Sequence, residues 1–345
     1  TRTFSSAASD VYKRQGKFTR FSFDSALLEN KLGDPTERDV LVHITKEGLD
    51  LISKGEKLPV LIYLAPFTSS GLGRANWKAF GESLPQRHER LVSNGLMKPV
   101  ILVMPDCFTS LGGNQYVDSQ VLGNWSTWLK TDLKQEIQSR FNCSNKFGLF
   151  GKSSGGFGSI YNALIAPDAW HAIASHSGDV GFDTVYRNDL HAAATQISQH
   201  GSIDNFITHT RETTKLSSDE FYALMICAMA ASYDSTTTQD SKFGIRLPID
   251  MHSGEIKSEV WQNWLSYDPL NLLETYKDCL KSLDLCFIDC GNKDQYNLHF
   301  GSRLLHQKLT SLGIEHNYEE FSGTHSGIED RLDISMPMLA NSLQN

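Results

Sequence analysis

Short apolar runs alternate with segments of helical period along most of the chain, and this alternation restricts the fold more than any other feature. Pro59–Leu64 and Pro99–Met104 are continuous apolar runs of strand length, which suit strands buried on both faces. Further runs of this kind occur at Val40–Ile44, Phe147–Phe150, Ala172–Ser175, Leu283–Ile288 and His316–Phe321. Strands that alternate with helices are typical of a parallel sheet. The sequence therefore predicts an α/β fold with a mostly parallel central sheet flanked by helices.

Two of the segments between these runs show a helical stripe. Apolar side chains recur every four residues at Trp125, Leu129, Leu133, Ile137 and Phe141. Asn124 precedes this stripe and is a candidate N-cap. The second stripe contains Leu298, Leu305, Leu309 and Leu312. It is followed by Gly313, a residue suited to the position just past a helix.

The strand rhythm stops between about residues 182 and 266. This stretch is rich in Thr, Ser and Asp, apart from one apolar block at residues 221–231 (FYALMICAMAA). We expect a mainly helical insertion over the carboxyl edge of the sheet. The block is interpreted as a buried helix or, alternatively, as an apolar wall for an acyl or aromatic substrate group. Residues 16–345 are expected to form a single domain that carries this insertion.

Residues 1–15 (TRTFSSAASDVYKRQ) differ from the rest of the chain. They lack the apolar segment of a signal peptide, and SSAASDVYKRQ resembles a translated sequencing-library adapter of the kind found on metagenomic reads. We interpret them as a non-native, adapter-derived leader. Because a native start with a signal peptide can have been lost, the localisation is unknown, with a slight preference for the cytoplasm.

Composition excludes several classes of protein. Of the 345 residues, 40% are hydrophobic and 21% are charged, which is typical of a globular chain and not of a disordered one. The net charge of -8, with scattered Lys and Arg, argues against nucleic acid as a partner. No apolar run reaches the ~20 residues that span a bilayer. The six cysteines form no CxxC pair and HExxH is absent, so neither a redox nor a zinc-protease motif is present.

The strongest motif is the GxSxG at Gly151–Gly155, with Ser153 at its centre. It follows the expected strand Phe147–Phe150 and leads into a helical segment, which is the setting of a nucleophile elbow. The serine of such an elbow occupies a tight, strained turn, and the glycines avoid collisions with the neighbouring strand and helix. Ser153 is therefore the expected nucleophile. The alternative is a glycine-rich turn with an incidental serine.

A serine nucleophile needs a histidine base that is oriented by a carboxylate. In this type of sheet the order along the chain is nucleophile, acid, base. Asp294 lies in the loop after the strand Leu283–Ile288, and His325 lies in the loop after His316–Phe321. Both are expected at the carboxyl edge of the sheet, where such sites assemble.

Other residues compete for these two roles. Asp289 is the rival acid, but it is expected inside or at the tip of its strand. His299 and His316 are the rival bases nearest in sequence, and both are interpreted as surface residues.

Ester hydrolysis also needs hydrogen-bond donors for the oxyanion. One donor is expected to be the backbone N–H of Ser154, the residue after the nucleophile. The second is expected in the loop after the strand Pro59–Leu64. Pro66 in this loop has no N–H, so Phe67 is the favoured donor and Thr68 the next candidate.

These motifs together resemble the "putative esterase" family of the α/β-hydrolases. The segments that carry the resemblance are LPVLIYLAPFTSSG, PVILVMPDCFTSLGGNQYVDS, FGLFGKSSGGFGS, FIDCGNKDQYNLH and FSGTHSG, within a region from about residue 40 to the C-terminus. The family includes S-formylglutathione hydrolase (esterase D), feruloyl esterases, enterochelin esterases and the antigen 85 mycolyltransferases. The resemblance implies an α/β-hydrolase fold. It also implies Ser153, Asp294 and His325 as the triad, with Phe67 and Ser154 as oxyanion donors.

The resemblance also implies a substrate cleft. The loops that carry Trp77 and Gly112–Tyr116 would border it, so Trp77, Thr68, Lys152 and Tyr116 are candidate substrate-binding residues. This sequence departs from the family pattern at Ala65-Pro66, where many members have a His-Gly or similar pair, and this affects the first oxyanion donor. Lys152 stands where many members have an uncharged residue. It is either solvated or favours an acidic substrate group.

The sequence thus predicts a serine carboxylesterase that hydrolyses carboxylic or thio esters through a Ser-His-Asp triad and an acyl-enzyme. Its expected partner is a small-molecule ester, and the mechanism requires no metal and no organic cofactor. An acyltransferase of the mycolyltransferase type remains an alternative, as does a catalytically silent, hydrolase-like binding protein. A homodimer is compatible with the sequence.

Overall fold

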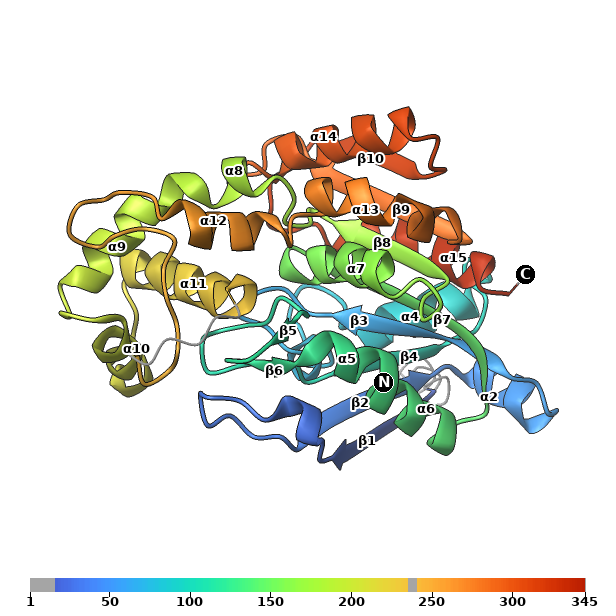
Figure 1. Ribbon diagram of the computed structural model, residues 1–345. Helices are drawn as coiled ribbons and strands as arrows, with labels where there is room; N and C mark the ends of the chain where they lie inside the picture. The colour runs from blue at the N-terminus through green and yellow to red at the C-terminus, as the bar shows by residue number, and fades with distance from the viewer. Residues whose placement is uncertain (1–15, 235–240, 345) are drawn as a thin grey trace, which may run out of the picture.

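The computed structural model describes residues 16–234 and 241–344, which form an eight-stranded sheet with helices on both faces (Figure 1). The strand order is β1-β2-β4-β3-β7-β8-β9-β10. The strands are β1 (Lys17–Phe23), β2 (Arg38–Ile44), β3 (Leu58–Leu64), β4 (Ile101–Pro105), β7 (Cys143–Lys152), β8 (Ala172–His176), β9 (Leu285–Gly291) and β10 (Asn317–Phe321). Strands β1 and β2 run antiparallel to their neighbours, whereas the pairs from β4 through β3, β7, β8 and β9 to β10 are parallel. The expected α/β fold with a mainly parallel sheet is confirmed.

Each of the seven expected strands overlaps a strand of this sheet. Strand β1 was not expected from the sequence. It pairs only with β2 and its side chains are exposed or half-buried, so it lacks the continuous apolar run by which the inner strands are recognised.

Helices cover the two faces of the sheet because successive side chains of each inner strand point to opposite sides. In β3, Val60 and Ile62 pack in one apolar cluster while Leu61 and Tyr63 pack in the other. The first cluster lies under α5 (Trp125–Trp128), η2 (Leu129–Leu133), α6 (Lys134–Arg140), α7 (Ser154–Ile165), α13 (Pro269–Lys281) and α14 (Leu298–Ser311). The second lies under α4 (Leu84–Ser93) and α15 (Leu332–Ser342). The shorter elements are η1 (Ala26–Leu28), α2 (Lys46–Ser53), α3 (Gly71–Arg74), β5 (Asp118–Ser119), β6 (Gly123–Asn124) and η4 (Glu329–Arg331).

The helical stripe that begins at Trp125 forms one helical rod with a π-turn in its middle, from α5 through η2 to α6. Asn124 occupies the N-cap position as expected, but its side chain makes no capping hydrogen bond. The carboxylate of Asp118 caps the helix instead, and it accepts from the backbone N–H of Thr127 at 2.8 Å and from its hydroxyl at 2.6 Å. At the other predicted stripe, α14 ends before Gly313, which has the expected positive φ of 65°.

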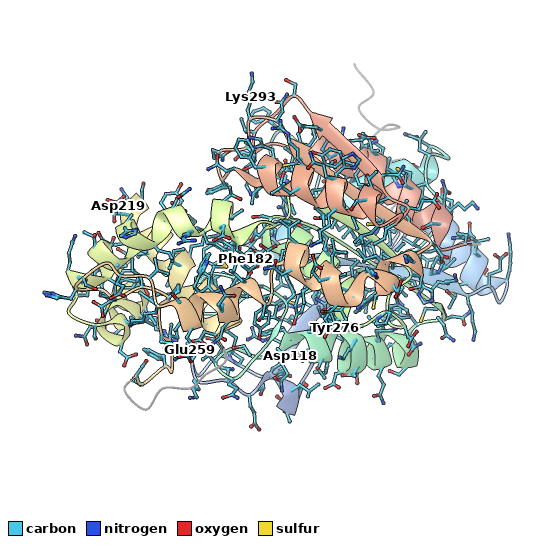
Figure 2. The ribbon with its side chains drawn as sticks, turned by 45° about the horizontal axis from the view of Figure 1, so that its top comes forward. Asp118, Phe182, Asp219, Glu259, Tyr276 and Lys293 are labelled. Atoms are coloured by element: carbon cyan, nitrogen blue, oxygen red, sulfur yellow. The ribbon has the colours of Figure 1, made fainter. Side chains whose placement is uncertain are left out.

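Several helices lie between β8 and β9: α8 (Phe182–Val185), η3 (Arg187–Asp189), α9 (Leu190–Ser198), α10 (Ile203–Glu212), α11 (Ser218–Tyr233), α12 (Ser258–Leu265) and then α13. Figure 1 shows α9 to α12 gathered to the left of the sheet. In Figure 2, Phe182 of α8 lies among the packed helices, where it is fully buried, while Asp219 lies at the periphery. The division into leader, domain and insertion remains a prediction, and residues 1–15 lie outside the described residues.

Helix α11 contains the apolar block FYALMICAMAA, and ten of its sixteen residues are buried. Tyr233 at its end joins an aromatic cluster with Phe182 and Trp264, at ring-centroid distances of 4.8 and 5.6 Å. The block is therefore a buried helix that anchors its neighbours. None of the helices in residues 16–234 and 241–344 combines the length and the hydropathy needed to cross a bilayer.

Candidate active site

Ser153 occupies the turn between β7 and α7 with φ 56° and ψ -124°. Its backbone N–H donates to the carbonyl of His176 on β8 at 2.9 Å, and its carbonyl accepts from Phe157 at 2.8 Å. A serine in this region of φ/ψ space is strained, and such strain persists only where the surrounding structure enforces it. The strained backbone holds Ser153 at the carboxyl end of the central strands.

The two glycines of the motif have a steric role. A Cβ atom on Gly151 or Gly155 would lie deep inside van der Waals contact with the carbonyl oxygen of Leu64 on β3. No side chain fits at either position, because the elbow passes directly over the neighbouring strand. The steric role expected for the glycines of the GxSxG motif is therefore observed.

Asp294 and His325 form a close pair at the ends of β9 and β10. The Nδ1 atom of His325 lies 2.8 Å from Oδ2 of Asp294, and both side chains are almost fully buried. The other carboxylate oxygen accepts from the backbone N–H of Tyr296 at 2.9 Å. The Tyr296 ring packs edge-on against the imidazole with 4.9 Å between centroids. The imidazole is thus held in one orientation by a carboxylate and an aromatic ring.

The loops that carry this pair are joined through their backbones. The N–H of Asn292 donates to the carbonyl of Phe321, and the N–H of Lys293 to that of Gly323, both at 2.9 Å. The separation of Asp294 and His325 is therefore set by the parallel pairing of β9 and β10.

Ser153 and His325 line one cavity of about 280 Å³. Within the described part of the chain, neither the Ser153 hydroxyl nor the Nε2 atom of His325 hydrogen-bonds to another residue. Phe221, Met225 and Met229 of α11, spaced four residues apart, also line the cavity. The apolar block of α11 therefore provides both a buried helix and an apolar cavity wall.

Two backbone N–H groups beside Ser153 are candidate oxyanion donors. The N–H groups of Phe67 and Ser154 make no hydrogen bond within residues 16–234 and 241–344, and both residues line the cavity. Thr68 lines it too, but its N–H already donates to the carbonyl of Gly112 at 2.6 Å. The local turn of Thr68 thus removes it as a donor and leaves Phe67 and Ser154.

A second Ser-His-Asp chain lies inside the protein. His176 places Nδ1 2.7 Å from Oδ1 of Asp289 and Nε2 2.9 Å from the hydroxyl of Ser335 on α15. All three side chains are at most about 2% exposed, and Arg331 donates to the other oxygen of Asp289 at 2.8 Å. No substrate reaches a serine with 0% exposure, so this chain anchors α15 to the sheet. Asp289, the rival acid, is thereby engaged elsewhere.

Neither rival histidine lines the cavity. Nε2 of His316 lies 2.8 Å from Nδ1 of His306. The surface interpretation of His299 was wrong, since it is only 9% exposed and packs against Phe300.

Two candidate substrate-binding residues do not reach the cavity. Trp77 lies on the loop after α3, and 79% of it is exposed. Tyr116 is 1% exposed, and its hydroxyl donates to the carbonyl of Ala65 at 2.6 Å. Its hydrogen bond therefore fixes the backbone of the loop that carries Phe67. Lys152, by contrast, lines the cavity, and burial lowers the pKa of its ammonium.

Asp179 was missed in the sequence. It lies three residues beyond β8, is 5% exposed, lines the cavity and accepts from the hydroxyl of Tyr186 at 2.8 Å. Burial raises the pKa of its carboxyl from 3.8 to about 6. Its place just past a strand, in the segment Ser177-Gly178-Asp179, is the same signal that pointed to Asp294.

Residues 49–328 match the family model described as "Putative esterase". Comparison with curated protein sequences finds no significant match.

Several solved structures share the fold. A ferulic acid esterase superposes with a TM-score of 0.60 at 16% identity, covering 96% of this chain and 99% of that one. An S-formylglutathione hydrolase from Agrobacterium tumefaciens gives 0.57 at 14% identity, covering 95% and 96%. MPT51 from Mycobacterium tuberculosis gives 0.54 at 14% identity, covering 94% and 99%. Since the family model spans most of the sequence, the chain belongs to the "Putative esterase" family and is an ester hydrolase of the α/β-hydrolase fold.

Proposed function

We propose that the protein hydrolyses carboxylic or thio esters with Ser153 as nucleophile. The observation that carries the proposal is the convergence, on one cavity, of a strained serine, an oriented Asp294–His325 pair and two unpaired backbone N–H groups. No other cavity-lining serine lies on a strained elbow in the described residues.

In the proposed reaction, Nε2 of His325 takes the Ser153 proton as the hydroxyl oxygen attacks the ester carbonyl. The N–H groups of Phe67 and Ser154 donate to the oxyanion. The C–O or C–S bond then breaks, and His325 returns the proton to the leaving alcohol or thiol. Water repeats the sequence on the acyl-enzyme and releases the carboxylic acid.

A fluorophosphonate probe tests the nucleophile directly. We expect covalent labelling at a single residue, Ser153, because phosphonylation needs the same activated hydroxyl and oxyanion donors. Peptide mass spectrometry of the labelled protein locates the adduct. An unlabelled protein, or an adduct on another serine, would refute the assignment.

The cavity wall supports a substrate class. Phe221, Met225 and Met229 offer apolar surface, and Phe67 packs edge-on against Phe221 with 5.8 Å between ring centroids. Asp179 adds a buried acceptor beside this wall. We infer a substrate with an apolar acyl or aryl group and a nearby hydroxyl or amine that donates to Asp179. A panel of acyl and hydroxyaryl esters tests this through kcat/KM.

The burial of the Asp179 carboxyl is expected to make the free energy of unfolding depend on pH. The pKa of this carboxyl is about 6 in the folded protein, against an ordinary value of 3.8 that stands for the unfolded chain. As the pH rises, Asp179 therefore ionises in the unfolded chain before it ionises in the folded protein. The free energy of unfolding therefore decreases between about pH 4 and pH 6 and stays at the lower value above pH 6. Asp179→Asn removes this penalty, so we expect it to raise the free energy of unfolding by roughly 2–3 kcal/mol at pH 8 and by little at pH 4.

Denaturant melts at both pH values measure this effect. The exposed Asp219 is the matched control, and Asp219→Asn should change the free energy of unfolding by under about 0.5 kcal/mol at either pH. Equal effects of Asp179→Asn at pH 4 and pH 8 would contradict a buried, costly carboxylate.

A further inference from the structure

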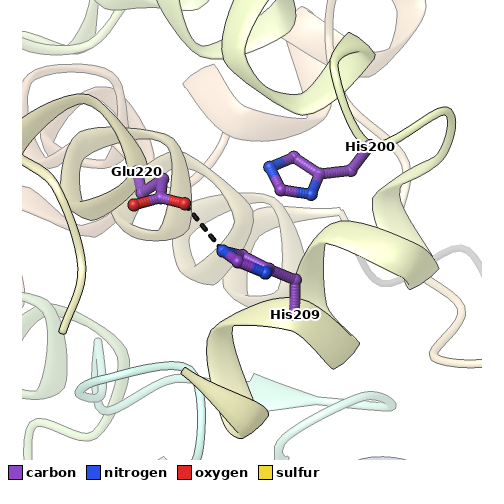
Figure 3. Close-up of side chains that lie close together, drawn as sticks. All are labelled: His200, His209 and Glu220. Carbon is purple, nitrogen blue, oxygen red and sulfur yellow. Dashed lines mark hydrogen bonds and ion pairs between the residues drawn. The ribbon is translucent and has the colours of Figure 1, made fainter. Parts of the chain in front are cut away.

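Two histidines and a carboxylate meet where three helices of the segment between β8 and β9 converge (Figure 3). His200 follows the end of α9, His209 lies on α10, and Glu220 lies in the first turn of α11. One ligand atom from each residue lies within 4.8 Å of the other two. None of the three residues lines the catalytic cavity.

The spacing is close to that of a metal centre. Nε2 of His209 lies 2.7 Å from Oε1 of Glu220. The rings of His200 and His209 are 4.5 Å apart between centroids, at an interplanar angle of 35°. A tetrahedral Zn²⁺ with bonds of about 2.0–2.2 Å separates its ligand atoms by roughly 3.3 Å. The His200 imidazole must therefore approach by at most about 1.5 Å, and the hydrogen-bonded contact between His209 and Glu220 must lengthen by about 0.6 Å.

Glu220 is preset as an anionic ligand. Its Oε2 atom accepts from the backbone N–H of Ser217 at 2.7 Å and from its hydroxyl at 2.8 Å, which leaves Oε1 turned toward His209. The capping box of α11 thus fixes an ionised oxygen in place.

In contrast to His209, His200 forms no ion pair with Glu220. Its ring nitrogens make no hydrogen bond within the part of the chain that the structure describes, although they lie beside a second imidazole and a carboxylate. Two protonated imidazoles at this separation would repel each other, whereas two neutral ones offer lone pairs to a shared cation. The side chain of His209 is 39% exposed, which gives an ion a path from solvent.

We propose that His200, His209 and Glu220 bind a divalent transition metal, with Zn²⁺ as the best fit. Two imidazole nitrogens and one carboxylate oxygen match its ligand preference, and water would complete the tetrahedron. The ion would join α9, α10 and α11. It is separate from the acyl-transfer chemistry, but Glu220 directly precedes Phe221 of the cavity wall, so metal binding would also steady that wall.

Isothermal titration with ZnCl₂ on the full-length, chelator-treated protein tests the proposal. We expect one site of micromolar affinity or better, and a rise in Tm of roughly 5 °C when free Zn²⁺ exceeds Kd about 100-fold. His209→Ala and His200→Ala should each weaken binding at least 10-fold. Glu220→Gln should do the same while it keeps the capping geometry, because glutamine also serves at this position of a capping box.

The chain offers a matched control. His306 and His316 form a second close histidine pair, with Nδ1 and Nε2 2.8 Å apart, but no carboxylate joins them in a three-ligand group among the described residues. His306→Ala should leave Zn²⁺ binding unchanged. No measurable binding by the parent protein, or equal losses in His306→Ala and His209→Ala, would overturn the proposal. The readout involves no turnover, so it is independent of the proposed esterase function.

Discussion

Replacement of Ser153 by alanine is expected to lower the turnover of p-nitrophenyl acetate and butyrate by about 10⁶-fold. The size of the effect follows from the way the three residues act as a unit. Without the hydroxyl no acyl-enzyme forms, and the Asp294–His325 pair has no proton to take. Only the weak catalysis that the oxyanion donors supply to water would remain. Initial rates over a range of substrate concentrations measure the loss.

Ser335 is the matched control for this experiment. Unlike the Ser153 hydroxyl, the Ser335 hydroxyl is hydrogen-bonded to a histidine that contacts an aspartate, and it has 0% exposure. Ser335→Ala leaves the buried Nε2 of His176 without its partner, so it should reduce the free energy of unfolding by about 1–3 kcal/mol and leave kcat within a few-fold. Hydrolysis that persists in Ser153→Ala, or disappears in Ser335→Ala, would reverse the assignment of the two serines.

Replacement of Asp294 by asparagine is expected to lower kcat by about 10⁴-fold with little change in KM. An amide is nearly isosteric with the carboxylate, but it can donate to Nδ1 of His325 and so favour the tautomer whose proton lies on Nε2. That tautomer cannot accept the Ser153 proton. The amide also fails to stabilise the imidazolium that forms during attack. Steady-state kinetics with the same esters measure kcat and KM separately.

Asp289→Asn provides the contrasting variant. Asp289 is fully buried between His176 and Arg331, so its neutralisation removes one of the two carboxylates that the partly buried Arg331 guanidinium contacts, the other being Glu319. We expect the free energy of unfolding to fall by roughly 3 kcal/mol, while turnover per folded molecule stays within a few-fold. If Asp289→Asn lost turnover as severely as Asp294→Asn, the internal Ser-His-Asp chain would have to take part in the reaction.

Features set by short stretches of sequence could be predicted. The strands at Pro59–Leu64 and Phe147–Phe150 are apolar on both faces, and such runs are stable only inside a covered sheet. The strained turn at Ser153 was expected because Gly151 and Gly155 leave room that no other residue leaves. Asp294 and His325 were paired on the order of residues along the chain and on their places after strands.

Features that depend on contacts across the fold could not be predicted. Asn124 has the residue type and position of an N-cap, but the backbone N–H of Thr127 in the first turn donates to Asp118 of the preceding hairpin instead. Trp77 was placed at the cleft and is exposed, while Asp179 was overlooked and lines the cavity. In each case the local residue type was a sound guide to chemistry but not to neighbours.

By itself, the sequence determined the layered α/β architecture and the glycine spacing that permits the strained turn at Ser153, since hydrophobic period and glycine spacing act within a few residues. Only the tertiary structure shows that His176, Asp289 and Ser335 form a hydrogen-bonded chain inside the protein, whereas Ser153 shares a cavity with His325. Ser153 and Ser335 have the same hydroxyl. They differ in exposure, and exposure is a property of everything packed around a side chain. The meeting of His200, His209 and Glu220 was decided in the same way, because three helices have to dock before those atoms become neighbours.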